Sequence, residues 1–262
     1  MSIMEFGICN ISIIAVRKEP SERSEMITQL IFGELYEIID KKKDWINIRI
    51  AFDNYEGWIS VNQSYTIKES TYNILNKFPV DTTAEIISEL YNKNKNEKFN
   101  IPLGSSLPHL NNNIISFDNM YYVLFGGINK SNIRTSRDRI VETSMLYLNA
   151  PYLWGGRTPF GIDCSGLTQM VFKINRIKLL RDASQQYTEG NNISFISEAH
   201  PGDLAFFDNE EGEIIHVGII LEKNKIIHAS GKVKIDNIDH YGIFNPDNNK
   251  YTHKLRLIRS YI

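Results

Sequence analysis

Hydrophobic and polar residues alternate in short runs over the first 67 residues. Runs rich in β-branched and aromatic residues are separated by polar loops that contain Gly, Pro, Asp or Asn. This pattern is typical of β-strands joined by turns. It predicts five strands, at residues 11–16, 26–31, 35–39, 45–50 and 57–61. We therefore expect a small β-barrel at residues 1–67.

Residues 68–130 carry a weaker pattern of the same kind. Short apolar runs at 113–117 and 120–125 follow a polar segment at 92–98. We interpret this region as a second, divergent β-barrel at 68–130. The Gly- and Asn-rich segment that follows predicts a linker.

Helical periodicity begins after this linker. Residues 137–148 are predicted to form a helix that Ser136 caps and that packs through Ile140, Val141, Met145 and Leu148. A second helix is predicted at 164–174, because Leu167, Met170, Val171 and Ile174 share one face and Asp163 precedes it. Apolar runs at 216–222 and 226–229 predict a β-hairpin with its turn at 223–225. Residues 131–262 therefore read as an α+β domain.

Cys164 stands at the start of the second predicted helix, directly after Asp163. Unpaired backbone N–H groups and the positive end of the helix dipole favour a thiolate there, which predicts a pKa below the ordinary value of about 8.5. A small buried hydrophobic residue is the other interpretation of the same cysteine.

Two histidines favour the reactive thiol. The predicted hairpin makes His216 and His228 neighbours on adjacent strands, so one of them is able to act as a base and the other to orient it. A zinc site is the competing use of one Cys and two His, but structural zinc usually takes four ligands. Cys9 lies in an apolar run and is expected in the core. The other histidines, His109, His200, His240 and His253, lack motif context and are expected to be structural or exposed.

Residues 134–262 resemble the NlpC-type cysteine peptidases, which have a papain-like fold. The resemblance is carried by Y-L-W-G-G at 152–156, D-C-S-G at 163–166, R-D-A-S-Q-Q at 181–186, P-G-D-L-A-F-F at 201–207, H-V-G-I at 216–219 and I-H-A-S at 227–230. It implies that Cys164 is the nucleophile, His216 the general base and His228 the orienting residue. The first barrel is similar to bacterial SH3-like domains.

The resemblance also implies a substrate. Relatives with two such barrels look like γ-D-glutamyl-diamino acid endopeptidases, which act on short murein peptides with a free N-terminal L-alanine. The substrate-binding residues that we expect are Tyr152, Trp154, Asp163, Ser165, Asp182, Ser184 and, from the first barrel, Glu56. Trp154 is also explained as a core residue, and Glu56 as a solvated loop residue.

Composition narrows the function further. A formal net charge of −2 argues against a nucleic-acid partner. No apolar run approaches the ~20 residues of a membrane span. Two distant cysteines argue against a disulfide framework, and residues 1–16 lack the pattern of a signal peptide. We expect a cytoplasmic, monomeric enzyme without metal or cofactor that recycles murein peptides.

Three alternatives remain open at this stage. A secreted peptidoglycan hydrolase would use its SH3-like domains as wall anchors. A non-catalytic murein-peptide-binding protein would have the same fold but no peptidase activity. An acyltransferase would pass the same thioester to an amine. The sequence also leaves the diamino acid open between meso-diaminopimelate and L-lysine.

Overall fold

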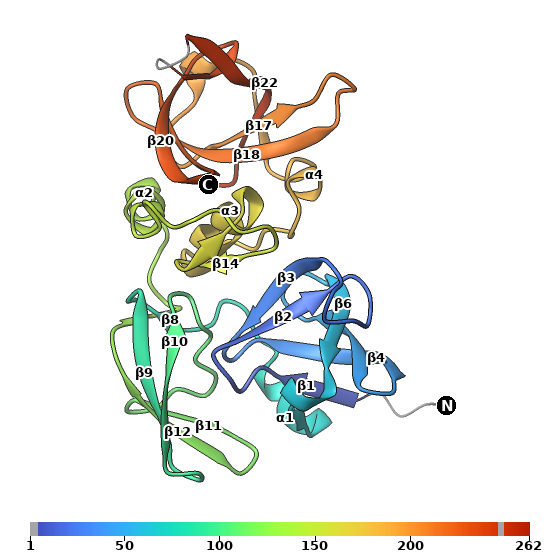
Figure 1. Ribbon diagram of the computed structural model, residues 1–262. Helices are drawn as coiled ribbons and strands as arrows, with labels where there is room; N and C mark the ends of the chain where they lie inside the picture. Colours follow the sequence, from blue (N-terminus) through green and yellow to red (C-terminus); the bar gives the residue numbers. More distant parts are fainter. Residues whose placement is uncertain (1–4, 246–248) are drawn as a thin grey trace. The chain divides into compact units, whose positions relative to one another are not determined.

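The computed structural model describes residues 5–245 and 249–262, and the chain divides into two compact units (Figure 1). Unit 1 ends at Ile133 and unit 2 begins at Arg134. Each unit is described by itself below.

Unit 1 begins with a seven-stranded sheet of strand order β3-β2-β6-β5-β4-β1-β7. Its strands are β1 (Glu5–Ile8), β2 (Ile13–Arg17), β3 (Met26–Ile31), β4 (Leu35–Lys42), β5 (Trp45–Ile50), β6 (Glu56–Ser60) and β7 (Thr66–Ile67), with the 3-10 helix η1 at Val61–Gln63. The five predicted strands are confirmed, with the bounds of β3 and β5 unchanged. The prediction missed β1 and β7, which are short and pair with each other only in the folded chain.

The rest of unit 1 contains helix α1 and two smaller sheets. The elements are α1 (Glu69–Leu75), β8 (Thr82–Thr83), β9 (Ile87–Asn92), β10 (Glu97–Pro102), β11 (Ile114–Phe117), β12 (Met120–Phe125) and β13 (Ile128–Asn129). The predicted runs at 113–117 and 120–125 are strands β11 and β12. The polar segment at 92–98 is the turn of the β9–β10 hairpin, flanked by strand ends.

One hydrophobic cluster joins the two parts of unit 1. It contains Phe6 and Phe32 from the first part, Tyr72 from α1, and Leu90 and Tyr122 from the four-stranded sheet β10-β9-β12-β11. The rings of Phe32 and Tyr122 meet edge to face with centroids 5.3 Å apart. The parts therefore share a core, and the division into barrels at residues 67 and 68 stays a prediction.

Unit 2 contains three α-helices and a second seven-stranded sheet of order β16-β22-β17-β18-β19-β20-β21. Its elements are α2 (Arg137–Met145), β14 (Arg157–Thr158), β15 (Gly161–Ile162), α3 (Cys164–Ile174), α4 (Ala183–Gln186), β16 (Asn191–Ile193), η2 (Ile196–Glu198), β17 (Leu204–Asp208), β18 (Ile214–Leu221), β19 (Lys225–Ser230), β20 (Lys232–Ile238), β21 (Gly242–Asn245) and β22 (Lys250–Ser260). Helix α3 packs against β18 and β19, and α2 packs against α3. The predicted hairpin is β18–β19.

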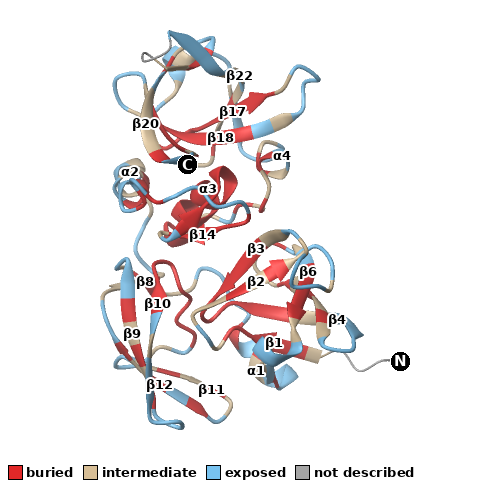
Figure 2. Ribbon diagram, viewed as in Figure 1, coloured by how far each residue is buried: buried red, intermediate tan, exposed pale blue. Residues whose placement is uncertain are grey.

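Helix α3 has the bounds that the sequence predicts. The side chain of Asp163 caps it by accepting the N–H of Gly166 at 2.6 Å. Every residue of α3 is buried, including its polar ones (Figure 2). The cap and the apolar period are local features, which is why the sequence located this helix well.

The prediction for α2 is partly wrong. The helix ends at Met145, which is 39% exposed, and Leu148 beyond it is 38% exposed. The packed face instead consists of Ile140, Thr143 and the following Tyr147, all buried. Because the helix ends at Met145, Leu148 no longer follows its apolar face. Met145 and Leu148 were predicted for the core and instead lie at the surface. The cap is confirmed, because Ser136 accepts an N–H of the first turn.

In the described ranges 5–245 and 249–262, no helix is both long enough and apolar enough to cross a membrane.

Candidate active site

Three adjacent antiparallel strands bring together three polar side chains in unit 2. His216 lies on β18, His228 on β19 and Asp236 on β20. Nε2 of His216 is 2.8 Å from Nδ1 of His228, and Nε2 of His228 is 3.0 Å from Oδ2 of Asp236. The predicted proximity of the two histidines is confirmed. The sequence analysis missed Asp236, although the Gly231 turn between β19 and β20 signals a hairpin that returns it to His228.

Gly218 makes room for His228 on the neighbouring strand. A Cβ atom at Gly218 would lie 2.9 Å from Cβ of His228, well inside the usual cross-strand separation of about 4.5–5.5 Å. The glycine of H-V-G-I therefore lets the two strands approach at the histidine pair.

Cys164 begins α3 beside strand β18. Backbone N–H groups of Ser165 and of Val217, the residue after His216, donate hydrogen bonds to its sulfur. The thiol is 8% exposed, and burial together with the nearby Asp163 carboxylate raises its pKa to about 12. The predicted lowering of this pKa is wrong, because desolvation of the thiolate outweighs the helix terminus.

The imidazole of His216 shares this buried environment. Its pKa is lowered well below the ordinary value, first by burial and then by repulsion from His253, His228 and Lys234. A raised thiol pKa and a lowered imidazole pKa mean that both groups are neutral near pH 7. The site at rest holds a thiol and a neutral imidazole rather than an ion pair.

His253 on β22 is a second residue that the sequence analysis did not assign to the site. Its ring stacks on that of His216, with centroids 4.2 Å apart and an angle of 27° between the planes. Burial lowers the pKa of His253 to about 4. Ring nitrogens of His216, His228 and His253 lie within 4.8 Å of one another. A metal ion there would have to break the His216–His228 hydrogen bond.

Asp163 and Ser165, which flank the nucleophile, are bound by Arg181. The guanidinium donates to both carboxylate oxygens of Asp163, at 3.1 and 2.6 Å, and to the hydroxyl of Ser165 at 2.9 Å. Asp163 also accepts the backbone N–H of Gly155 at 2.8 Å. All three polar side chains are buried. This network holds the glycine-rich loop against the start of α3. The sequence analysis gave Arg181 no role, and its place in the motif R-D-A-S-Q-Q was the one signal for it.

Tyr152 and Trp154 lie on that loop. Tyr152 is 36% exposed and lies near the thiol, since partial burial and the neighbouring Cys164 and Asp163 raise its phenol pKa to about 12. Trp154 is 60% exposed, which excludes the interpretation of it as a core residue.

The other predicted substrate residues lie further from the thiol along the chain. Asp182 is the half-buried N-cap of α4, where its N–H donates to the side chain of Gln185 at 3.0 Å, and Ser184 is exposed. Glu56 belongs to unit 1, where it is exposed on β6 and accepts from Arg49 at 2.7 Å.

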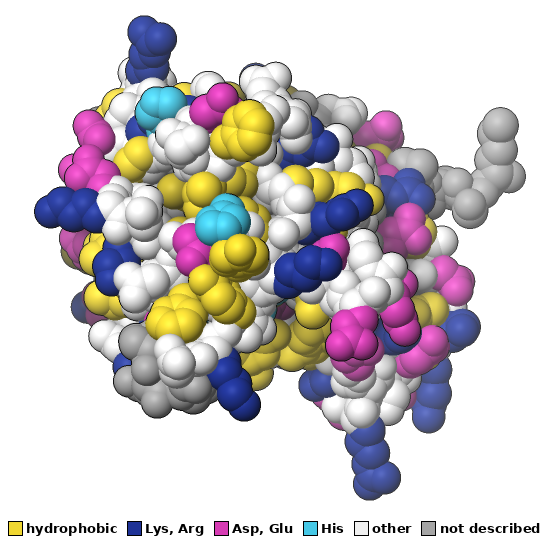
Figure 3. Space-filling model, turned by 90° about the horizontal axis from the view of Figure 1, so that it is seen from above, with side chains coloured by type: hydrophobic (Ala, Val, Ile, Leu, Met, Phe, Trp, Pro, Cys, Tyr) yellow, Lys and Arg dark blue, Asp and Glu magenta, His cyan; other side chains and the backbone are white. Residues whose placement is uncertain are grey.

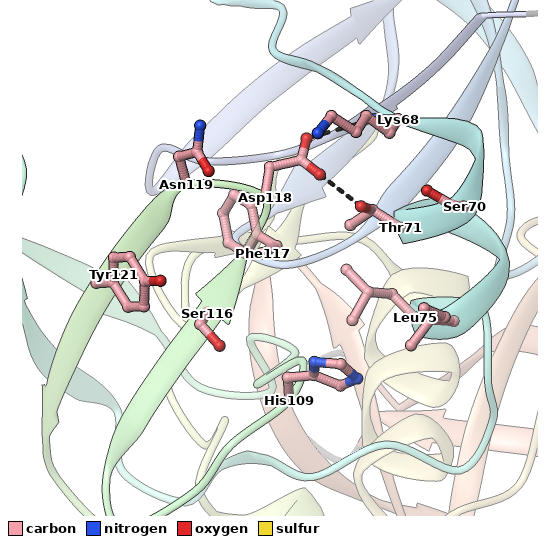
Figure 4. Close-up of a pocket in the computed structure, with 11 residues that line it drawn as sticks. Lys68, Ser70, Thr71, Leu75, His109, Ser116, Phe117, Asp118, Asn119 and Tyr121 are labelled. Carbon is pink, nitrogen blue, oxygen red and sulfur yellow. Dashed lines mark hydrogen bonds between the residues drawn. The ribbon is translucent and has the colours of Figure 1, made fainter.

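Pockets also lie outside this site, among them one in unit 1 and a second in unit 2. In unit 1, a pocket of about 300 Å³ lies between α1 and the turn before β12, with Lys68, Thr71, His109, Asp118 and Tyr121 among its lining residues (Figure 4). Thr71 donates to the carboxylate of Asp118 there. No predicted site residue lines this pocket.

The second pocket belongs to unit 2 and measures about 360 Å³. It is lined by Phe195, His240 and Leu257 among others. Phe195 is 66% exposed. Figure 3 shows, on one face of the molecule, that hydrophobic side chains lie exposed among polar and charged ones. This pocket also holds none of the predicted site residues.

Comparison with known protein families identifies two segments of the chain. Residues 149–253 match the NlpC/P60 family, and residues 16–63 match the bacterial dipeptidyl-peptidase SH3 domain. The chain thus contains an NlpC/P60 domain and a bacterial SH3 domain.

Its relatives are described in more specific terms. The γ-D-glutamyl-L-lysine dipeptidyl-peptidase of Bacillus subtilis is 26% identical over 77% of this chain and 71% of its own length. Dipeptidyl-peptidase 6 of Lysinibacillus sphaericus is 27% identical over 84% of this chain and 87% of its own length. The crystal structure of an NlpC/P60 family protein from Bacillus cereus superimposes with a TM-score of 0.84, at 19% identity, over 98% of this chain and 99% of that chain.

Proposed function

We propose that this protein is a cysteine endopeptidase that cleaves the γ-D-glutamyl to diamino acid bond of short murein peptides. The observation that carries the proposal is the hydrogen bond between His216 and His228, because His216 lies on β18 directly before Val217, whose N–H contacts the Cys164 thiol. The relatives named for the γ-D-glutamyl-L-lysine bond support the substrate class.

In the proposed reaction, the thiol of Cys164 attacks the γ-carbonyl carbon while Nδ1 of His216 takes its proton. Proton transfer accompanies attack, because both groups are neutral at rest. The backbone N–H of Cys164 at the start of α3 stabilises the oxyanion. His216 then returns the proton to the leaving amine, and water hydrolyses the thioester. His228 orients His216 through the 2.8 Å hydrogen bond.

The proposed substrate has a free N-terminal L-alanine. Tyr152 and Trp154, which are both exposed on the loop before Cys164, offer aromatic surface to the peptide. The carboxylate proposed to bind its ammonium group is that of Asp182, with Ser184 as a hydrogen-bonding neighbour; a role for Glu56 stays a prediction from the sequence. Asp163 and Ser165 are also proposed to lie near the substrate's N-terminal residue, and Arg181 holds both at the start of α3.

We further propose that the enzyme recycles murein peptides in the cytoplasm and that residues 68–130 form a second SH3-like barrel. The sheet β10-β9-β12-β11 supports the second barrel. The match to a dipeptidyl-peptidase SH3 domain supports a role in the processing of murein peptides.

The test is turnover of L-Ala-γ-D-Glu-L-Lys and of its meso-diaminopimelate analogue, each with a free and an acetylated N-terminus, followed by mass spectrometry. Release of L-Ala-D-Glu from the free peptides alone supports the proposal. Equal cleavage of acetylated peptides would favour a wall hydrolase with an open cleft. Cys164→Ala is the control, and full turnover by this variant would refute a cysteine mechanism.

A further inference from the structure

The hydrogen-bond chain from His216 through His228 ends at the carboxylate of Asp236. We propose that Asp236 is a positioning residue, which fixes the tautomers of both histidines and leaves Nδ1 of His216 able to accept a proton. The inference rests on the function proposed above, in which His216 is the base for Cys164.

The tautomers follow from the donors and acceptors in turn. An ionised carboxylate only accepts hydrogen bonds, so the 3.0 Å contact requires a proton on Nε2 of His228. In the proposed arrangement the ring of His228 carries this one proton, so its Nδ1 has a lone pair and the 2.8 Å contact requires that Nε2–H of His216 donates. Neutral His216 is left with its lone pair on Nδ1. The opposite tautomer would carry a proton on Nδ1 and could not accept one from the thiol.

The surroundings of Asp236 and of His216 agree with the protonation states assigned to these two groups. The hydrogen bond from His228 lowers the pKa of Asp236 to about 2, so its carboxylate is ionised. Burial keeps His216 neutral. The ionisable groups near His216 are His253 on β22, His228 on β19 and Lys234 on β20, and all three disfavour a positive charge on it.

The β19–β20 hairpin holds Asp236 in place. Lys234 pairs directly with His228 in the strand register, and Asp236, two residues later, lies on the same face of the sheet. Nζ of Lys234 is 3.0 Å from Oδ2 of Asp236, the oxygen that also contacts His228. Lys234 therefore compensates the negative charge of the Asp236 carboxylate and favours an oxygen atom at the position of Oδ2.

The experiment compares Asp236→Ala with Asp236→Asn in the full chain. Asparagine keeps an acceptor oxygen for His228 and Lys234, whereas alanine removes it. Two-bond ¹H–¹⁵N spectra of histidine-labelled protein report which ring nitrogens carry protons. We expect Asp236→Ala to lose the Nε2–H tautomer of His228 and at least about 10-fold in kcat, with little change in KM. Asp236→Asn should keep the tautomers and most of kcat.

Asp239→Ala is the matched control. Asp239 precedes β21 in the same sheet and accepts a 2.6 Å hydrogen bond from Tyr251, outside the histidine chain. Unchanged tautomers in Asp236→Ala, or an equal loss of kcat in Asp239→Ala, would overturn the proposal. If the wild-type protein cleaves no γ-D-glutamyl peptide, the proposed function fails by itself. The histidine spectra need no substrate and still test Asp236.

Discussion

Arg181 binds both carboxylate oxygens of Asp163, the residue directly before Cys164, and both side chains are almost completely buried. The pair joins the segment before α4 to the cap of α3. Removing one partner leaves a charge that neither water nor a counterion compensates. Such a change in a buried pair typically costs about 3–5 kcal/mol of unfolding free energy.

Arg181→Met is therefore expected to lower the free energy of unfolding by about that amount, measured by urea denaturation. The control is Arg49→Met, which breaks the exposed pair with Glu56 and should cost less than about 1 kcal/mol. Equal losses in the two variants would contradict a special role for the buried pair.

The neutral resting state of Cys164 predicts the pH dependence of its alkylation. With a thiol pKa raised to about 12, little thiolate exists at pH 7, and the rate with iodoacetamide should rise steadily from pH 7 to 10. Cys9→Ala leaves Cys164 as the only thiol and is the protein to use. A plateau between pH 5 and 8 would instead reveal a preformed thiolate–imidazolium pair.

Stability should fall on mild acidification because the folded protein keeps His216 and His253 neutral. Both folded-state pKa values are lowered, that of His253 to about 4, while the unfolded chain binds protons from about pH 6.5 downward. Unfolding is therefore favoured progressively as the pH drops from about 6.5 toward 4, and above that range these groups have no effect.

Urea midpoints between pH 4 and 8 measure this dependence. His253→Phe retains an aromatic ring against His216 and should reduce the slope by up to about 1.4 kcal/mol per pH unit. His200→Gln removes an exposed histidine and serves as the control. A wild-type slope in His253→Phe would show that another group takes up the proton.

Gly218→Ala is expected to disturb the histidine pair. The added methyl group would lie 2.9 Å from Cβ of His228, so β18 and β19 must separate. We expect a loss of about 1–3 kcal/mol in stability and a fall in kcat. Gly231→Ala, in the turn after β19, meets open space but has φ of +71°. It should reduce stability through backbone strain and leave kcat nearly unchanged; an equal fall in kcat would contradict the steric argument.

Local features of the sequence determined several parts of the structure. Helix α3 followed from the cap at Asp163 and from an apolar period that needs no distant contact. The β18–β19 hairpin followed from two apolar runs around a short turn, and it brought His216 to His228. In each case, the deciding interactions join residues close in sequence.

Only the tertiary structure decided the rest of the site. His253 reaches His216 because β22 returns through the sheet to pair with β17, and no local signal specifies that return. The pKa of Cys164 rises because α3 is buried on all sides, whereas its sequence position alone predicted a fall. The sequence by itself specified which ionisable groups the site contains. How far each group is desolvated depends on how distant chain segments pack together, and only the tertiary structure decides that.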